Sequence, residues 1–270
     1  MTKGPGGQNV TTTAMNTESV FQSVLMNYLV SQARTVESSV SRALMALLDR
    51  NERLASEVFL TEPRINEMEI VIDEHAIRLL RRGSFSDDEM RLIVASLKIT
   101  NDLERIGDIA VSLAERVITL RDMPNATMPE ELRPMAEAVR SMVSRSLGAL
   151  IFRNAEMASQ VLESDDVVDQ YRDQIFEALM HSMTQNATLV SPGLQFVLAT
   201  RHLERIADHA TNIAEDIIFW VRGLDVRHGR GLMVRAEQET TTVSPAAAEV
   251  TENSHALHPQ VTPNCEAHGV

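Results

Sequence analysis

The sequence is poor in cysteine and in aromatic residues. It contains one cysteine, Cys265, together with one Trp, two Tyr and seven Phe among 270 residues. A single cysteine excludes an internal disulfide and gives little support to a thiol nucleophile, and the absence of disulfides is typical of a reducing compartment. Leu, Ile, Val, Met and Ala supply most of the 44% hydrophobic content, and this composition favours a bundle of helices.

Long apolar runs and excess positive charge are also missing. No apolar run approaches the roughly 18 residues that a membrane-spanning helix needs, and the N-terminal string MTKGPGGQNVTTTAMNTE has no apolar signal segment. The net charge is −13, whereas a nucleic-acid binder uses Lys and Arg to neutralise phosphates. We therefore expect a cytoplasmic protein that does not bind nucleic acid and reaches a membrane only through partners.

Motifs of the common enzyme classes are absent as well. The phosphate-binding patterns Gly-x-x-x-x-Gly-Lys-[Ser/Thr] and Gly-x-Gly-x-x-Gly do not occur. A ferritin-like di-iron oxidase needs Glu-x-x-His pairs on its core helices, and the one such pair, Glu252 with His255, lies in a polar C-terminal segment. We therefore predict no catalytic residues.

What the sequence does contain is helical periodicity over most of its length. Start signals support the boundaries: Ser86–Glu89 and Thr127–Glu130 match the capping box, and Ser191 precedes a proline that suits a first helical turn. No stretch of strand length alternates with period two, so the predicted fold class is all-α. The predicted helices span residues 17–59, 62–82, 86–122, 128–162, 165–184 and 192–223.

The chain also contains an internal repeat. SVSRALMALLDRNERLASEVFL, from Ser39, is similar to MVSRSLGALIFRNAEMASQVLE, from Met142, so that Asn51 corresponds to Asn154 at an offset of 103. The offset falls to 100 at two Leu-Glu-Arg-Ile-x-Asp motifs. A repeat of this length indicates two tandem homologous three-helix bundles. The predicted organisation is a disordered N-terminus at 1–16, a first unit at 17–123, a second unit at 124–223 and a disordered C-terminal tail at 224–270.

Each Leu-Glu-Arg-Ile-x-Asp motif places two carboxylates one helical turn apart. They are Glu104 and Asp108 in the first copy and Glu204 and Asp208 in the second. Like charges at this spacing repel by a few tenths of a kcal/mol. Leu103 and its counterparts on the other side of each helix are expected to face the core.

The second helix of each unit offers oxygen donors at the same spacing. These are Glu62 with Asn66 and Asp165 with Asp169. Neighbouring helices lie about 8–10 Å apart, so two such pairs can face each other across a groove and bind a hard cation such as Mg²⁺, Mn²⁺, iron or Zn²⁺. A solvated acidic face is the alternative interpretation.

Basic and imidazole side chains near the motifs have simpler interpretations. Arg105 and Arg205 lie beside the acidic stripes, where they can screen the carboxylates, and we assign them no chemistry. His202 and His209 flank the second motif, and a lone histidine on a helix is more often a surface or capping residue than a ligand.

Over residues 17–223 the sequence resembles the PhoU family. The resemblance is carried by NDLERIGDIAVSLAE (Asn101–Glu115) and above all by RHLERIADHATNIAEDIIFWVRG (Arg201–Gly223). It implies a multinuclear metal site on the outer acidic face of each bundle, commonly of iron or zinc, with magnesium or manganese as further options. Carried over by position, the implied metal ligands are Glu62, Asn66, Asn101, Glu104, Asp108, Asp165, Asp169, Glu204, Asp208 and Asn212.

The sequence departs from the family pattern at Asn66, where an acid is usual. A neutral amide is a weaker ligand, so the resemblance implies a poorer first site, although Glu69 and Asp73 form another Glu-x-x-x-Asp pair nearby that can compensate.

The resemblance also implies a function. Similar proteins are cytoplasmic negative regulators of phosphate uptake and of the phosphate-starvation response. They are thought to link the ATPase subunit of the high-affinity phosphate ABC transporter with the sensor histidine kinase of the phosphate two-component system, and a homodimer is expected. Two alternatives stay open: a metalloenzyme that acts on phosphate esters or polyphosphate, and a purely structural bundle.

Overall fold

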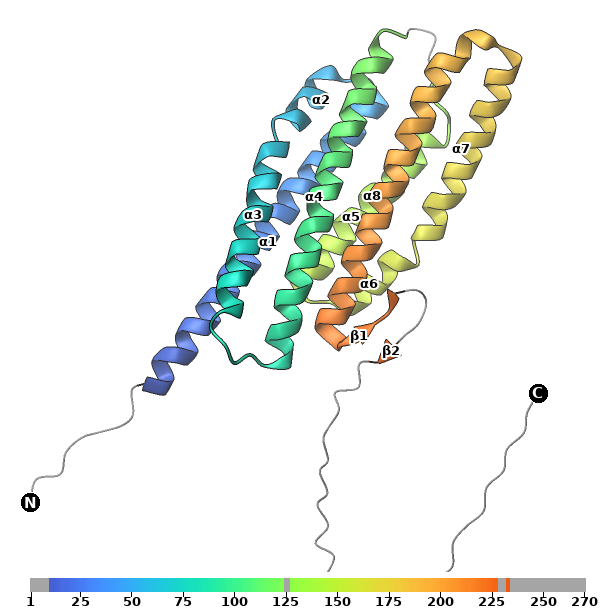
Figure 1. Ribbon diagram of the computed structural model, residues 1–270. Helices are drawn as coiled ribbons and strands as arrows, with labels where there is room; N and C mark the ends of the chain where they lie inside the picture. The colour runs from blue at the N-terminus through green and yellow to red at the C-terminus, as the bar shows by residue number, and fades with distance from the viewer. Residues whose placement is uncertain (1–9, 124–126, 228–231, 234–270) are drawn as a thin grey trace, which may run out of the picture. The chain divides into compact units, whose positions relative to one another are not determined.

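The computed structural model describes residues 10–123, 127–227 and 232–233. Nearly all of these residues are helical, which confirms the all-α class (Figure 1). A two-residue antiparallel ladder pairs β1 (Leu224–Asp225) with β2 (Leu232–Met233). The helices are α1 (Val10–Asp49), α2 (Glu52–Phe59), α3 (Glu62–Leu80), α4 (Asp87–Arg121), α5 (Leu132–Phe152), α6 (Ala155–Leu162), α7 (Asp165–Gln185) and α8 (Val190–Arg222), with the 3₁₀ turn η1 (Ala187–Leu189) before α8.

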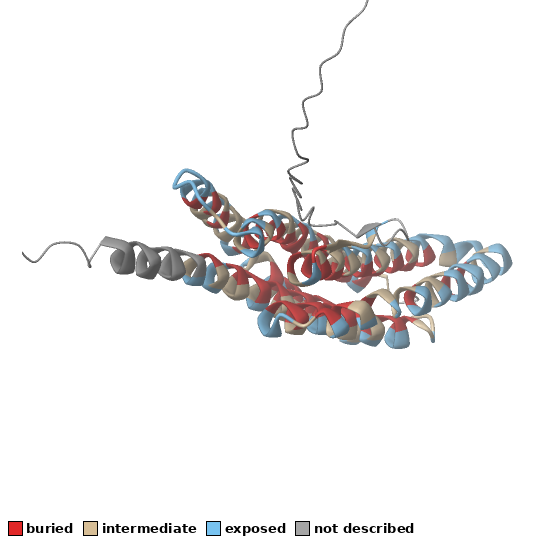
Figure 2. Cartoon of the chain, turned by 90° about the horizontal axis from the view of Figure 1, so that it is seen from below, coloured by how far each residue is buried: buried red, intermediate tan, exposed pale blue. Residues whose placement is uncertain are grey.

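The fold is duplicated, as predicted. Helices α1–α4 form unit 1 and helices α5–α8 form unit 2; in each unit a long helix and a short continuation pack against two further helices. Helices α4 and α8 lie side by side at the centre, and α1 also contacts α5 (Figure 1). Buried residues gather on the sides of the helices that face one another (Figure 2). Leu103 and its counterpart Leu203 are fully buried there, as predicted.

Two of the predicted helices are each divided in two. The expected helix 17–59 is broken after Asp49, and the expected helix 128–162 begins only at Leu132 and is broken after Phe152. At both breaks an arginine adopts a left-handed backbone conformation, with φ of 51° at Arg50 and 49° at Arg153. A residue in this region ends the α-helical ladder. The other four predicted helices correspond to α3, α4, α7 and α8, with ends that differ by at most two residues.

The bounds of the two terminal segments predicted to be disordered also differ from the structure. Helix α1 begins at Val10, inside the range 1–16 that was predicted to be disordered; residues 1–9 lie outside the described residues. The predicted tail 224–270 opens with β1, and residues 228–231 and 234–270 of that tail lie outside the described residues. The boundary predicted between the units falls beside residues 124–126, which are also not described.

Asparagine restarts the helix at each break. Asn51 Oδ1 accepts hydrogen bonds from the amides of Arg53 and Leu54, at 3.1 and 3.2 Å. In unit 2, Asn154 Oδ1 accepts from Glu156 and Met157 in the same way. A side-chain acceptor at this position satisfies amides that have no partner within the helix.

Replacing either cap with alanine is expected to lower the free energy of unfolding by about 1 kcal/mol, because two amides lose their acceptor. Chemical denaturation of Asn51→Ala and Asn154→Ala measures the loss. Asn51→Asp keeps an acceptor oxygen and is the matched control. Equal stability of Asn51→Ala and the wild type would show that the turn is held by other contacts.

Within the described parts of the chain, no helix combines the length and the apolar character needed to cross a membrane.

Candidate functional site

Four carboxylates gather between α3 and α4 in unit 1, and we call them the unit 1 acidic cluster: Glu69, Asp73, Glu104 and Asp108. Burial raises the pKa of Glu104, and the neighbouring charge of Asp108 raises it further against the opposing effect of Arg105. Burial also raises the pKa of Glu69, with additional contributions from Asp73 and Asp108. Burial and the neighbouring like charges thus both disfavour the ionised form of these carboxyl groups.

An amide oxygen without a partner lies on the same helix, α3. Asn66 Oδ1 is buried, and no hydrogen-bond donor reaches it from the described residues. Leaving a buried acceptor without a partner costs about 1–3 kcal/mol. Helix α3 approaches α4 closely here, because a Cβ on Gly107 would lie 3.0 Å from Cδ1 of Ile65, the residue before Asn66. An amide oxygen of this kind is a ligand for a hard cation.

The unit 2 acidic cluster consists of Asp165 and Asp169 on α7 and Glu204 and Asp208 on α8. Burial raises the pKa of Asp165, and the charges of Asp208, Asp169 and Glu204 add to the shift. Burial likewise raises the pKa of Asp208, with Glu204 and Asp169 next in size. The four carboxylates that the sequence pattern predicted for unit 2 are therefore brought together.

A guanidinium lies inside the unit 2 acidic cluster. Arg172 Nη1 is 2.7 Å from Asp169 Oδ1 and 2.7 Å from Glu204 Oε1. It joins α7 to α8 and neutralises part of the charge. At the offset of 103, Arg172 corresponds to Glu69, so unit 1 has a carboxylate where unit 2 has a cation. The two sites are thus chemically different, a feature that the Leu-Glu-Arg-Ile-x-Asp motifs do not reveal.

Three other predicted ligands are placed as follows. Glu62 is the first residue of α3 and is partly buried, and Asn101 is exposed on α4. Asn212 Nδ2 is 3.4 Å from Asp102 Oδ1 on α4 and so reaches across to the other unit. Residues four positions apart on a helix differ by about 40° in direction. The acidic stripe of α8 therefore faces α7 at Glu204 and has rotated toward α4 at Asn212. Ligand roles for these three residues stay predictions.

The carboxylates do not form a preorganised ligand set. In the parts of the chain that the structure describes, no three His, Cys, Asp or Glu side chains converge as a metal-binding group. Like charges without a counter-ion repel, so any cation bound here would require these side chains to rotate toward it.

Helices α4 and α8 also share a polar seam that the sequence pattern did not reveal. His209 Nδ1 lies 2.7 Å from Asp102 Oδ1, and Lys98 Nζ donates to Asp216 Oδ1 at 2.8 Å. His209 is therefore a partly buried member of this seam, a role that the surface or capping interpretation did not include. His202 is half-buried; burial lowers its pKa, and the charge of Arg116 adds to the effect.

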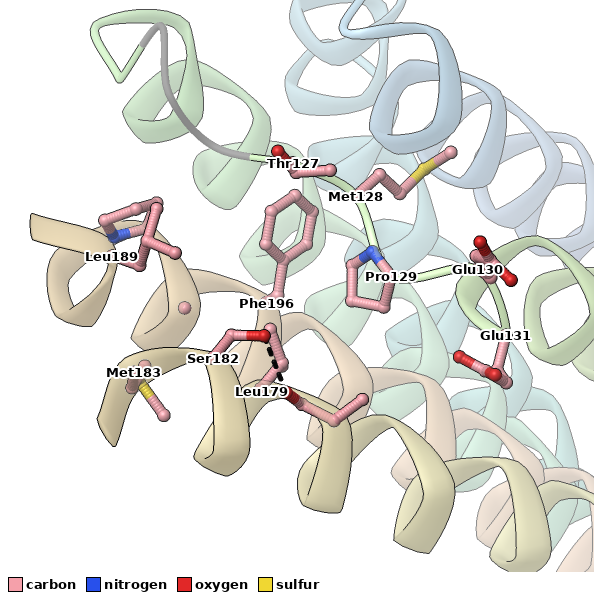
Figure 3. A pocket seen from close by; sticks show the side chains of 13 residues that line it. Thr127, Met128, Pro129, Glu130, Glu131, Leu179, Ser182, Met183, Leu189 and Phe196 are labelled. Carbon is pink, nitrogen blue, oxygen red and sulfur yellow. Dashed lines mark hydrogen bonds between the residues drawn. The ribbon is translucent and has the colours of Figure 1, made fainter. Parts of the chain in front are cut away.

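An apolar cavity of about 350 Å³ lies at one end of unit 2, between the inter-unit linker and α7 and α8. Figure 3 shows Phe196 on α8 directed toward the linker residues Thr127 and Pro129, with Leu179 and Ser182 on the neighbouring helix. The lining includes none of the predicted ligands. The candidate site is therefore a pair of surface clusters and not this cavity.

The comparisons with known proteins support the duplication and extend it to a family. The model of the PhoU domain matches residues 29–117 and 132–217. The chain is 35% identical over 223 residues to the phosphate-specific transport system accessory protein PhoU homolog of Pseudomonas putida, covering 82% of this chain and 86% of that protein. It is 37% identical over 205 residues to the homolog of Pseudomonas aeruginosa, covering 75% and 84%.

Solved structures give the same result. The crystal structure of PhoU from Pseudomonas aeruginosa matches with a TM-score of 0.74 and 34% identity, over 76% of this chain and 99% of that one. The phosphate transport system regulatory protein PhoU from Streptococcus pneumoniae matches with a TM-score of 0.70 and 25% identity, over 77% and 99%.

Proposed function

Because the chain belongs to the PhoU family, we propose that it is an accessory protein of a phosphate-specific transport system. The main support is that the PhoU domain model matches both units. The chain also covers most of the length of relatives that are named phosphate-specific transport system accessory proteins. As an accessory protein it associates with the transport system. The relatives are named accessory proteins and not enzymes, and we propose no catalytic activity for this chain.

We further propose that the chain is a negative regulator in the cytoplasm. In this proposal it contacts the ATPase subunit of the phosphate ABC transporter and the sensor histidine kinase of the phosphate two-component system, and it acts as a homodimer. Regulation of this kind requires that the chain bind one conformational state of each partner more tightly than the other state. A rigid helical body with two non-identical halves supports this role, since each half can present a different surface.

We propose that the acidic clusters bind iron, zinc, magnesium or manganese ions. In unit 1 the donor types fit a hard cation, because four mutually interacting carboxylates lie between α3 and α4 and the oxygen of Asn66 on α3 has no partner among the described residues. In unit 2 a cation must displace Arg172 from Asp169 and Glu204. We therefore propose that unit 1 binds more tightly, the reverse of the order that Asn66 implied. A bound ion would supply fixed positive charge on an otherwise acidic face.

The regulatory role is tested in cells of the source organism that lack this gene. Phosphate uptake and a phosphate-starvation reporter are expected to stay high in phosphate-replete medium, and the full-length chain should restore repression. Affinity capture of the tagged chain, after cross-linking in replete medium, is expected to retain the transporter ATPase; an untagged chain is the control. Normal repression without the gene would contradict the proposal.

The metal and enzyme questions need purified full-length protein. Elemental analysis that recovers no metal would support a purely structural bundle. Turnover of phosphate esters or polyphosphate by metal-loaded protein, lost in Glu204→Ala, would favour the metalloenzyme alternative.

A further inference from the structure

A second polar surface, with a charge opposite to that of the acidic clusters, lies between α1 and the start of α3. It is a groove of about 550 Å³ whose lining includes three arginines and four hydroxyl side chains and no Asp or Glu. The arginines are Arg34 and Arg42 on α1 and Arg64 on α3. We call it the arginine groove.

Two of the three arginines in the arginine groove form no ion pair within the described fold. The side chains of Arg34 and Arg64 are exposed and make no hydrogen bond or ion pair with any other described residue. Arg42 has one ion pair, with Nε 3.4 Å from Glu57 Oε2. Three guanidinium groups beside one another repel, and the chain as a whole has a net charge of −13. A local cluster of this sign in such a chain indicates an anionic ligand.

The internal repeat provides a control for this interpretation. At the offset of 103, Arg34 corresponds to Glu137 and Arg64 corresponds to Val167. Unit 2 therefore adopts the same helical arrangement with an acid and an apolar residue at these positions. The cluster is a property of unit 1 and not a requirement of the repeat.

The spacing of the arginines indicates the class of ligand. Arg34 and Arg42 are eight residues apart on α1, which corresponds to about 12 Å along the helix axis. A second groove of about 750 Å³ shares Arg34, Ser38 and Arg42 and continues toward α5, but its lining also includes Glu37 and Glu137. Arg140, at its far side, is paired with Glu137, so the free positive charge of the two grooves is confined to the arginine groove. Arginines spread over this length make the arginine groove better suited to a linear anion than to a compact one. Its lining has no aromatic side chain on which a base can stack.

We propose that the arginine groove binds a linear chain of linked phosphates, which it recognises through the phosphate oxygens alone. Arginine guanidinium groups pair with such oxygens in a bidentate manner, and the hydroxyl groups of Ser31 and Ser38 can donate further hydrogen bonds. The same chemistry occurs in inorganic polyphosphate and in the triphosphate of a nucleotide. This inference is independent of the proposed role in phosphate transport.

Isothermal titration calorimetry with tripolyphosphate on the chelator-treated full-length chain tests the proposal. Chelation removes any metal ion that could bridge phosphate to the acidic clusters. The wild type is expected to bind, and the variant Arg34→Glu/Arg64→Val, which installs the unit 2 residues, is expected to bind at least ten-fold more weakly. Both positions are exposed, so circular dichroism should show an unchanged fold.

The control is Arg81→Glu, which makes the same charge change as Arg34→Glu at an exposed position outside the groove. An equal loss in Arg81→Glu, or no tripolyphosphate binding by the wild type at millimolar concentration, would overturn the proposal. Inorganic phosphate that binds as tightly as tripolyphosphate would also overturn it, because a chain would then not be needed. Binding of ATP with the affinity of tripolyphosphate supports a nucleotide source, and weaker binding of ATP supports an inorganic one.

Discussion

Replacing Arg172 with glutamate is expected to increase the affinity of the unit 2 acidic cluster for a divalent cation at least ten-fold. The variant gives unit 2 the residue that unit 1 has at the corresponding position, Glu69. It removes a guanidinium that holds both Asp169 and Glu204 at 2.7 Å and adds a further carboxylate. A partly exposed ion pair of this kind contributes up to about 1 kcal/mol, which corresponds to about five-fold in affinity, since 1.4 kcal/mol corresponds to ten-fold. The added carboxylate ligand is expected to supply the remaining factor.

The same variant is expected to be less stable than the wild type when no metal is present. Five carboxylates then lie together without a counter-ion, so the melting temperature of the chelated protein should fall. Addition of Mn²⁺ or Zn²⁺ should raise it by more than in the wild type, because ligand binding to the folded state adds RT ln(1 + [L]/Kd) to its stability.

Calorimetric titration with Mn²⁺, combined with melting curves in chelator and in metal, measures both effects. Arg172→Gln is the graded control, since it removes the cation without adding a ligand and should give an intermediate affinity. Glu177→Gln, an exposed change on the same helix outside the cluster, should have no effect. Identical titrations for Arg172→Glu and the wild type would show that these carboxylates do not bind the ion.

The sequence was sufficient to predict the fold because helical periodicity and the repeat are local signals. Burial of Leu103 and Leu203 follows directly from their positions opposite the carboxylates. The two breaks in the long helices could not be predicted in this way, since Arg50 and Arg153 adopt a conformation that usually requires glycine or asparagine. The asparagine that follows each arginine was the only available signal, and Asn51 and Asn154 were already paired by the repeat.

The candidate site was predicted less completely. The spacing within each motif placed Glu104 beside Asp108, because i and i+4 positions always share a helix face. The partners from the neighbouring helix depend on how two helices are rotated against each other, which no local pattern encodes. The role of Arg172 is of this kind, although the repeat had aligned it with Glu69 and could have shown the reversal of charge.

The seam between α4 and α8 was not predicted for the same reason. Asp102 and His209 are 107 positions apart, and each lies next to a motif whose acidic residues drew the functional interpretation. Only the antiparallel packing of two distant helices brings them together, as shown also by Arg91 Nε, which donates to the carbonyl of Trp220 at 3.3 Å.

Replacing Lys98 with methionine is expected to lower the free energy of unfolding by about 2–3 kcal/mol near neutral pH. Lys98 donates to Asp216 at 2.8 Å, and the Asp216 residue is only 6% exposed. Removing one partner of a buried ion pair leaves an unpaired charge, at a cost of about 3–5 kcal/mol. Because Lys98 is partly exposed, we expect the cost for this pair to lie below that range. For a chain of this size the loss corresponds to a fall of about 4–12 °C in melting temperature.

The destabilisation in Lys98→Met is expected to shrink as the pH falls. Burial already raises the pKa of Asp216, Lys98 opposes the shift, Asp102 adds to it and Arg227 weakly opposes it. Without Lys98, the pKa of Asp216 is higher in the folded protein than in the unfolded chain. The folded state therefore binds the proton more tightly than the unfolded state does. The penalty is therefore present above the folded-state pKa and is removed as the pH falls through it toward the ordinary value of a carboxyl group.

A double-mutant cycle separates the pair from its surroundings. Lys98→Met/Asp216→Leu removes both charges, and it should be more stable than Lys98→Met alone because no buried charge is left unpaired. Lys98→Arg, which keeps the positive charge, should stay close to the wild type at all pH values. If Lys98→Met lost the same stability at pH 5 as at pH 7.5, or if the second substitution restored none of it, the loss would arise from packing of the lysine side chain and not from an unpaired carboxylate in the seam.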